Sequence, residues 1–267
     1  MKITHSYRKN VNQIILIMEE LKFHYKYPHP NVTTDCVIFG FDGKKLYVLL
    51  VERGSEPYKG SWAFPGGFLN IDESAEAGAL RELQEETGLK GAYIRQFHTF
   101  SEPDRDPRER ILSVAYYALV RLQDVKGGDD AVKAEWFALD KVPPLAFDHD
   151  EMLSMALKEM RKQIHFEPIG FELLPKEFTM RSLQQLYEAI LDVKFDRRNF
   201  YNKMIHLGLL NQVNHEDDDD VKEINFKFGP LEIDASFTRK PRRDALLYTF
   251  NAEKYEEMKQ KGFKLEF

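Results

Sequence analysis

Residues 67–89 read GFLNIDESAEAGALRELQEETGL, and this stretch decides the fold. Ser74 is a favourable N-cap and Gly88 a favourable C-cap residue, so the spacing predicts a helix over residues 75–87. A Gly- and Pro-rich stretch, residues 54–67, comes directly before it. The sequence therefore predicts a turning loop that leads into a helix with defined ends.

Three glutamates of this helix predict a metal site. Glu82, Glu85 and Glu86 stand at i, i+3 and i+4, so their carboxylates share one face, where each like-charged pair is unfavourable by a few tenths of a kcal/mol. A positive charge is expected there, and Mg²⁺ prefers oxygen ligands such as carboxylates and substrate phosphates. We expect Mg²⁺ (or Mn²⁺) on these side chains, with Gly66 turning a backbone carbonyl toward it. The alternative is an acidic helix face in solvent.

The complete pattern resembles the Nudix box at every specified position. It consists of Gly67, Glu73 and the run from Arg81 to Leu89. We interpret Gly67 as the residue that permits a tight turn. Arg81 is expected to pair with Glu73 and so to tie the loop to the helix.

The resemblance implies attack of a metal-activated water on a diphosphate. Glu82 and Glu86 are then the expected ligands, with Glu85 as a further ligand or base. Some Nudix enzymes take the general base from a loop outside the box, and here His149, within residues 148–151, is the candidate. The catalytic candidates are therefore Glu85, Glu86 and His149. An alternative is that residues 148–151 only cap the helix that follows them.

A second segment, residues 99–108, resembles the corresponding part of ADP-ribose-handling Nudix proteins and Nudix-related transcriptional regulators. Arg105 and Arg108 can each direct a guanidinium fork onto phosphate or ribose, and Arg53 can help them. We expect these three arginines to bind a nucleotide-type small molecule. ADP-ribose is the first candidate, although Arg105 stands where ADP-ribose pyrophosphatases often carry a proline.

Strand and helix patterns predict an α+β fold, a Nudix α/β/α sandwich with a mixed sheet followed by a C-terminal winged helix-turn-helix domain. Asp42-Gly43 predicts a hairpin between two apolar runs. Cys36 lies in the first run and is expected to be a small buried residue. The expected strands are residues 32–41, 45–52, 92–101, 111–120 and 133–139, and a second helix is expected over 150–163.

We divide the chain into three parts. Residues 1–30 form an N-terminal helical extension, with an amphipathic helix over 11–22. Residues 31–165 form the Nudix domain. Residues 166–267 form the winged-helix domain, because the preceding linker contains two prolines and has no clear period.

The C-terminal part resembles the winged helix of Nudix-related transcriptional regulators. Helices are expected over 181–191 and 197–207, the second capped by Asp196, with a wing hairpin that returns through 245–251. An acidic insert near residues 217–220 weakens a DNA-binding reading, so a protein-binding winged helix is the alternative. The expected DNA-binding residues are Arg197, Arg198, Asn199, Lys203, Arg239, Lys240, Arg242 and Arg243.

Composition limits the classes of function. The chain of 267 residues is 43% hydrophobic, has a net charge of −6 and contains one cysteine, which excludes a disulfide framework or a cysteine metal site. No apolar run is long enough for a membrane span, so we expect a cytoplasmic protein with no membrane partner. Double-stranded DNA and a second copy, as a homodimer, are the expected macromolecular partners. Three interpretations remain: a hydrolase with an accessory winged helix, a DNA-binding regulator that senses ADP-ribose or a sugar-type effector, and a protein that does both. Hydrolysis is ranked first because the box is intact.

Overall fold

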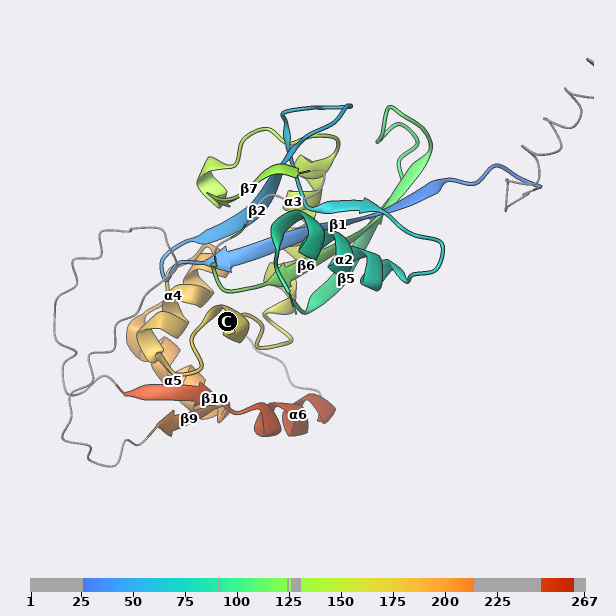
Figure 1. The fold of residues 1–267 in the computed structure, drawn as a ribbon. Helices are drawn as coiled ribbons and strands as arrows, with labels where there is room; N and C mark the ends of the chain where they lie inside the picture. Colours follow the sequence, from blue (N-terminus) through green and yellow to red (C-terminus); the bar gives the residue numbers. More distant parts are fainter. Residues whose placement is uncertain (1–25, 91, 124, 126–130, 214–245, 262–267) are drawn as a thin grey trace, which may run out of the picture.

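A mixed seven-stranded sheet occupies the centre of the molecule (Figure 1). The computed structural model describes residues 26–90, 92–123, 125, 131–213 and 246–261. The expected helix over 11–22, the acidic insert and the wing residues Arg239, Lys240, Arg242 and Arg243 lie outside the described residues. Among the helices that the structure describes, none has the length and apolar character needed to cross a bilayer.

The strand order is β3-β2-β1-β6-β5, and β4 pairs with β1 while β7 pairs with β2. Strand β1 runs parallel to β6, whereas the other pairs are antiparallel. The mixed sheet is therefore confirmed. Its strands are β1 (Asn31–Phe41), β2 (Leu46–Arg53), β3 (Trp62–Ala63), β4 (Gly66–Phe68), β5 (Ile94–Phe100), β6 (Ile111–Leu119) and β7 (Ala131–Ala138).

The predicted hairpin joins β1 to β2. Gly43 has a φ of 94°, a left-handed conformation that glycine adopts without steric cost. The Oδ1 atom of Asp42 accepts hydrogen bonds from the amides of Lys44 and Lys45, both at 2.7 Å. The side chain of Asp42 thus satisfies both turn amides and stabilises the turn locally.

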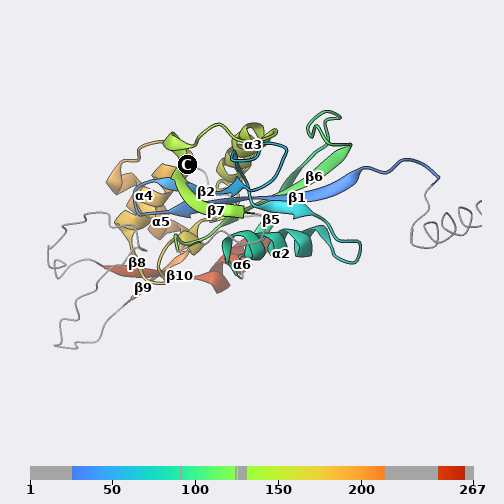
Figure 2. The same ribbon diagram turned by 45° about the horizontal axis from the view of Figure 1, so that its top comes forward.

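Helices α2 (Ala75–Thr87) and α3 (His149–Gln163) cover opposite faces of the sheet (Figure 2). Successive side chains of a strand point to opposite faces. Accordingly, Cys36 and Ile38 pack in the cluster beneath α2, whereas Val37 and Phe39 pack in the cluster beneath α3. The α/β/α sandwich is confirmed, with α2 over the expected residues and α3 beginning one residue earlier.

The C-terminal part is a helix-turn-helix with a three-stranded sheet, ordered β8-β10-β9. The side chains of Thr179 and Ser182 form a reciprocal capping box at the start of α4. The winged-helix fold is thereby confirmed, and α6 is a helix that the sequence patterns did not indicate. The elements are η2 (Phe171–Leu173), β8 (Phe178–Thr179), α4 (Met180–Leu191), α5 (Arg197–Leu207), β9 (Leu210–Val213), β10 (Leu247–Phe250) and α6 (Ala252–Gln260).

Helix α3 joins the two parts of the molecule. Met160 and Ile164 are fully buried in a hydrophobic cluster that also contains Leu186 and Ile190 of α4. In addition, the Nε atom of Arg161 donates a hydrogen bond of 2.8 Å to the carbonyl oxygen of Ile190. The cluster on the α3 face of the sheet therefore continues into the helix-turn-helix.

This shared core generates a first prediction. We expect Met160→Ala to lower the free energy of unfolding by about 2–5 kcal/mol, because it leaves a cavity in the core. Urea unfolding followed by circular dichroism measures the change, and both parts should still unfold in one transition. Lys158→Ala, an exposed change on the same helix, is the matched control and should stay within about 0.5 kcal/mol of the parent. Equal effects of the two substitutions would contradict the shared core.

Candidate functional site

Both ends of helix α2 are fixed by local hydrogen bonds. The Oγ atom of Ser74 accepts a hydrogen bond of 3.1 Å from the amide of Ala77. At the other end Gly88, with a φ of 76°, donates its amide to the carbonyl oxygen of Gln84. The predicted caps are therefore present, and they set the position of the glutamate face relative to the loop.

Two glycines let the glutamates approach the loop backbone. A Cβ atom on Gly67 would lie 2.4 Å from the Oε1 atom of Glu82, so the carboxylate occupies the space that a side chain would need. The amide of Gly66 donates a hydrogen bond of 2.9 Å to the Oε2 atom of Glu86. The sequence assigned a metal-facing carbonyl to Gly66, and that role stays a prediction.

Arg81 lies at the centre of the acidic helix face. Its Nε and Nη2 atoms bond both carboxylate oxygens of Glu73, at 3.1 and 2.7 Å, so the expected pair is present. The Nη1 atom also donates to Glu82 at 2.7 Å and to Glu85 at 3.0 Å. The hydrogen bonds that Glu73 accepts from Arg81, and then from the amide of Asn70, lower its pKa to about 2. This guanidinium offsets part of the negative charge, and the metal ion expected on the glutamates stays a prediction.

The glutamate face has the donor chemistry of a magnesium site. Within the described ranges no group of three or more acidic, histidine or cysteine side chains converges on one point. Negative charge is nevertheless concentrated there: besides burial, the charges of Asp35, Glu86 and Glu82 raise the pKa of the Cys36 thiol. Carboxylate oxygens suit a hard divalent cation. A bound cation would have to compete with Arg81 for the glutamates.

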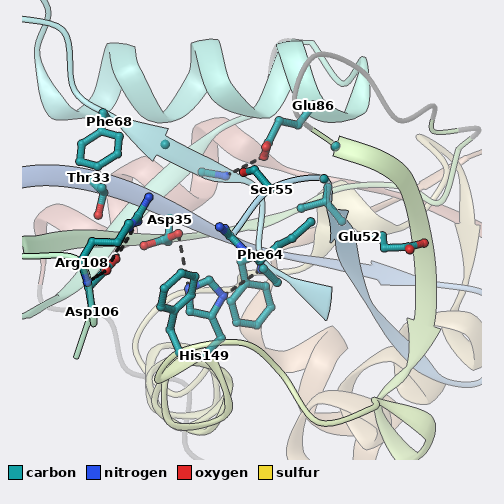
Figure 3. A pocket seen from close by; sticks show the side chains of 18 of the residues that line it. Thr33, Asp35, Glu52, Ser55, Phe64, Phe68, Glu86, Asp106, Arg108 and His149 are labelled. Carbon is teal, nitrogen blue, oxygen red and sulfur yellow. Dashed lines mark hydrogen bonds and ion pairs between the residues drawn. The ribbon is translucent and has the colours of Figure 1, made fainter. Parts of the chain in front are cut away.

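A cavity of about 140 Å³ opens beside this face (Figure 3). It gathers candidate residues from distant parts of the sequence. Glu82, Glu85, Glu73 and Arg81 are not among its lining residues. The predicted residues that line it are Arg53, Gly66, Gly67, Glu86, Arg105, Arg108 and His149.

Two arginines share an aromatic wall of the cavity. The guanidinium carbon of Arg53 lies 4.8 Å from the ring centroid of Phe147, and that of Arg108 lies 5.8 Å from the same ring. Arg108 also bonds both carboxylate oxygens of Asp106, at 3.0 and 2.7 Å. Burial, and then the charge of Arg108, lower the pKa of Arg53. A bound anion would relieve the repulsion between the two guanidinium groups. Arg53 and Arg108 therefore have the positive charge that suits a phosphate ligand.

Arg105 is held differently. Its Nε and Nη2 atoms bond both carboxylate oxygens of Asp148, at 2.8 and 2.7 Å, and its side chain is only 4% exposed. The guanidinium fork is therefore occupied within the protein. A direct role in substrate binding stays a prediction for Arg105.

His149 is buried, and its hydrogen bonding argues against the role of general base. The Nδ1 atom accepts a hydrogen bond of 3.0 Å from the amide of Phe64. In a neutral imidazole the proton then resides on Nε2, which lies 3.7 Å from the Oδ1 atom of Asp35. Burial lowers the pKa of His149 and so favours this neutral form. A neutral ring of this tautomer presents a donor toward Asp35, whereas a base needs a free lone pair.

Sequence reasoning missed Asp35 and Ser113. Asp35 lies on β1, lines the cavity and accepts a hydrogen bond from the Ser113 hydroxyl on β6. A signal for it was present, because Asp35 is a charged residue inside an otherwise apolar run. Its partner could not be identified, since the contact depends on the pairing of β1 with β6.

A basic surface forms at the start of α5. Arg197, Arg198 and Asn199 are exposed there, and Asp196 caps the helix by accepting a 2.9 Å hydrogen bond from the amide of Asn199. Lys203 is half-buried one turn further along. The structure therefore brings the first three expected DNA-binding residues to one exposed helix end.

Comparisons with known proteins match both parts of the chain. The NUDIX domain family matches residues 29–156, and the NrtR DNA-binding winged helix domain family matches residues 170–223. The chain is 32% identical over 191 residues to the ADPR responsive transcriptional repressor NtrR of Acinetobacter baylyi, covering 70% of this chain and 76% of that protein. It is also 38% identical over 145 residues to an ADP-ribose pyrophosphatase of Methanocaldococcus jannaschii, covering 54% and 83%.

Solved structures resemble the whole arrangement. A MutT/nudix family protein from Enterococcus faecalis has a TM-score of 0.66 at 30% identity, covering 76% of this chain and 90% of that chain. Shewanella oneidensis NrtR complexed with a 27mer DNA has a TM-score of 0.64 at 26% identity, covering 84% and 95%. The similarity therefore extends across the sandwich and the helix-turn-helix.

The contacts of Arg81 generate a second prediction. We expect Arg81→Ala to lower thermal stability, because Glu73 loses its partner and the glutamates lose their shared cation. A carboxyl whose pKa is lowered on folding stabilises the protein above its ordinary pKa of 4.5, and this contribution disappears as the pH falls through about 2. The difference in melting temperature between the parent and Arg81→Ala should therefore become smaller as the pH is lowered from 4.5 toward 2. Lys90→Ala removes an exposed cation just beyond the helix and is the control. A stability deficit that does not change with pH would contradict this assignment.

Proposed function

Because the chain belongs to the Nudix superfamily and joins its Nudix domain to an NrtR-type winged helix, we propose that it is a DNA-binding regulator that responds to a diphosphate-linked nucleotide. ADP-ribose is the candidate ligand, since the names of both curated relatives refer to it. The observation that carries the proposal is that one hydrophobic cluster contains both Phe64, which lines the cavity, and Phe200 of α5, the helix with the basic end.

The cavity supports the ligand assignment. Arg53 and Arg108 place two positive charges along one wall, where phosphate oxygens can accept their hydrogen bonds. Phe68 and Phe147 line the same cavity and offer apolar ring surface next to these charges. A nucleotide with a diphosphate linkage combines an anionic centre with flat or weakly polar groups, which matches this lining.

The basic end of α5 supports the DNA assignment. In helix-turn-helix proteins the second helix enters the major groove, and its N-terminal residues contact base edges. Arg198 and Asn199 occupy that position here, and such side chains can bond guanine and adenine edges respectively. We further propose that Arg239, Lys240, Arg242 and Arg243 contact phosphates from the wing, and that a homodimer reads a palindromic site.

Helix α3 supplies a physical link between the two sites. It begins at His149, which lines the cavity, and Arg161 near its other end bonds α4 of the helix-turn-helix. Coupling between two binding sites is reciprocal, so a ligand that alters DNA affinity must itself bind more or less tightly when DNA is present. We propose that nucleotide binding acts on DNA binding through this helix.

The DNA proposal generates a third prediction. Selection of genomic fragments by the purified protein should enrich one sequence, and ADP-ribose should change the affinity for it. We expect Arg198→Ala to relax the sequence preference at one position by about 1–3 kcal/mol. Lys162→Ala is the control. It also removes one exposed positive charge, but from α3 rather than α5, and it should leave the sequence preference unchanged.

Two results would count against this proposal. If no sequence is enriched with or without ADP-ribose, the C-terminal domain is a protein-binding module instead. If Arg198→Ala and Lys162→Ala weaken binding to all DNA sequences to the same extent, α5 does not contact base edges.

Hydrolysis of the same nucleotide is the second candidate function, and the intact glutamate face favours it. We propose that Glu82, Glu85 and Glu86, with the Gly66 carbonyl, hold Mg²⁺ or Mn²⁺. When bound, such a metal lowers the pKa of water and neutralises charge on the diphosphate. Arg53 and Arg108 would then orient the phosphates, and Gly66 would hold Glu86 in place through its amide.

The glutamate face generates a fourth prediction. We expect Glu86→Gln to keep the fold but to reduce Mg²⁺-dependent release of AMP from ADP-ribose by orders of magnitude, because one anionic ligand is lost without a change in shape. Chromatography of the products measures AMP and ribose phosphate. Glu76→Gln, an exposed change in the first turn of the same helix, should leave the rate unchanged. Normal turnover by Glu86→Gln at saturating Mg²⁺ would exclude this helix as the metal site.

A further inference from the structure

A second cavity, of about 160 Å³, lies between the edge of the seven-stranded sheet and the three-stranded sheet. Its walls come from three parts of the chain: strands β5 and β6, the segment that follows α3, and β10 with α6. It shares no lining residue with the cavity beside the glutamate helix. The second cavity is therefore a separate place where a ligand would touch both parts of the molecule.

Aromatic rings dominate the walls of the second cavity. Phe171 and Phe250 are stacked, with ring centroids 4.3 Å apart and an angle of 27° between the ring planes. Tyr117 and Tyr255 also line it, and Tyr93 lines it although that residue is 78% exposed. Tyr93 is thus open to solvent and available to a ligand. Rings of this kind bind another aromatic ring by offset stacking or by edge-to-face contact.

The volume of the second cavity limits the size of the ligand. An apolar cavity of about 150 Å³ in a protein core accommodates one benzene molecule. The second cavity, at about 160 Å³, therefore has room for one six-membered ring with a small substituent. A whole nucleotide is too large for it.

The charged groups on the walls do not favour an anion. Arg95 is the cation among the lining residues, and its Nη1 and Nη2 atoms bond both carboxylate oxygens of Glu167, at 3.0 and 2.9 Å. The guanidinium fork is therefore already occupied. Glu172 adds a second carboxylate to the lining. An anionic ligand would lose its water shell and meet this carboxylate without gaining a free cation.

The surroundings of Tyr255 lead to the same conclusion. Burial, and then the charges of Glu167 and Glu256, raise the pKa of Tyr255 to about 12, although Arg95 acts in the opposite direction. The Nζ atom of Lys259 lies 5.8 Å from the centroid of the Tyr255 ring, but this lysine is exposed and is not a lining residue. Water and salt weaken the effect of such a charge. The cavity is thus suited to a ring without negative charge.

We propose that the second cavity binds a compound with one aromatic ring and no negative charge, and that this compound holds the three-stranded sheet against the edge of the seven-stranded sheet. Tyr93 and Tyr117 belong to the Nudix part, whereas Phe250 and Tyr255 belong to the C-terminal part. A ring that touches both sets of side chains links the two sheets. Because the second cavity disfavours phosphate, this ligand differs from the nucleotide proposed for the first cavity.

The test uses the 267-residue chain with benzyl alcohol and benzoate, two compounds that share one ring and differ in charge. Titrations followed by saturation transfer difference NMR give the dissociation constants. We expect benzyl alcohol to bind at least about tenfold more tightly than benzoate, because the carboxylate of benzoate is not compensated in the cavity. Tyr93→Ala should weaken the binding of benzyl alcohol by roughly threefold to tenfold, since one aromatic contact is lost.

Phe68→Ala is the matched control, because Phe68 is another exposed aromatic residue that lines a cavity, in this case the first one. It should leave the binding of benzyl alcohol unchanged. A second measurement locates the ligand without any substitution. Amide hydrogen exchange in β10 and α6 should slow when benzyl alcohol is present, because a ligand that touches both sheets opposes local opening, whereas exchange in α2 should not change.

Four results would each overturn the inference. Benzyl alcohol does not bind, or benzoate binds as tightly as benzyl alcohol does. Alternatively, Phe68→Ala weakens the binding of benzyl alcohol as much as Tyr93→Ala does, which would place the ring in the first cavity. Finally, exchange in β10 and α6 is the same with and without benzyl alcohol, which would mean that the compound does not link the two sheets.

Discussion

The pairing of strand β1 is the constraint on which the other parts of the site depend. Its first half pairs with β4, which carries Gly66 and Gly67, and its second half pairs with β2. Along its other edge it pairs with β6, which carries Ser113. Alternate β1 side chains face α2 and α3. A shift of one residue in this strand would exchange the two faces and separate the glutamate helix from the cavity.

Most charged side chains of the site have a partner of opposite charge within the protein. Arg81 compensates part of the negative charge on the acidic face of α2, and the buried Arg105 pairs with Asp148. Arg53 and Arg108 keep a positive field along one wall of the cavity, although Asp106 offsets part of it. The partners in these pairs are all side chains of the protein itself, so the charged groups of the site partly compensate one another.

Local features could be predicted from the sequence, whereas contacts across the sheet could not. Helix α2 and its pairing of Arg81 with Glu73 follow from caps and spacings within one segment. Asp35 and Ser113 are 78 residues apart, and they meet only because β1 runs parallel to β6. The orientation of His149 likewise depends on the backbone amide of Phe64, a group that carries no sequence signal.

The last turns of α3 have a consequence for how such proteins can diversify. Met160 in the last turn of α3 and Ile164 just beyond its end share a hydrophobic cluster with residues of α4, and they follow His149 on the same segment. A helix-turn-helix unit transplanted from a relative would pack against side chains that do not match it unless this helix were inherited with it. Recombination between relatives is therefore expected to preserve this packing when the junction lies before α3 rather than after it.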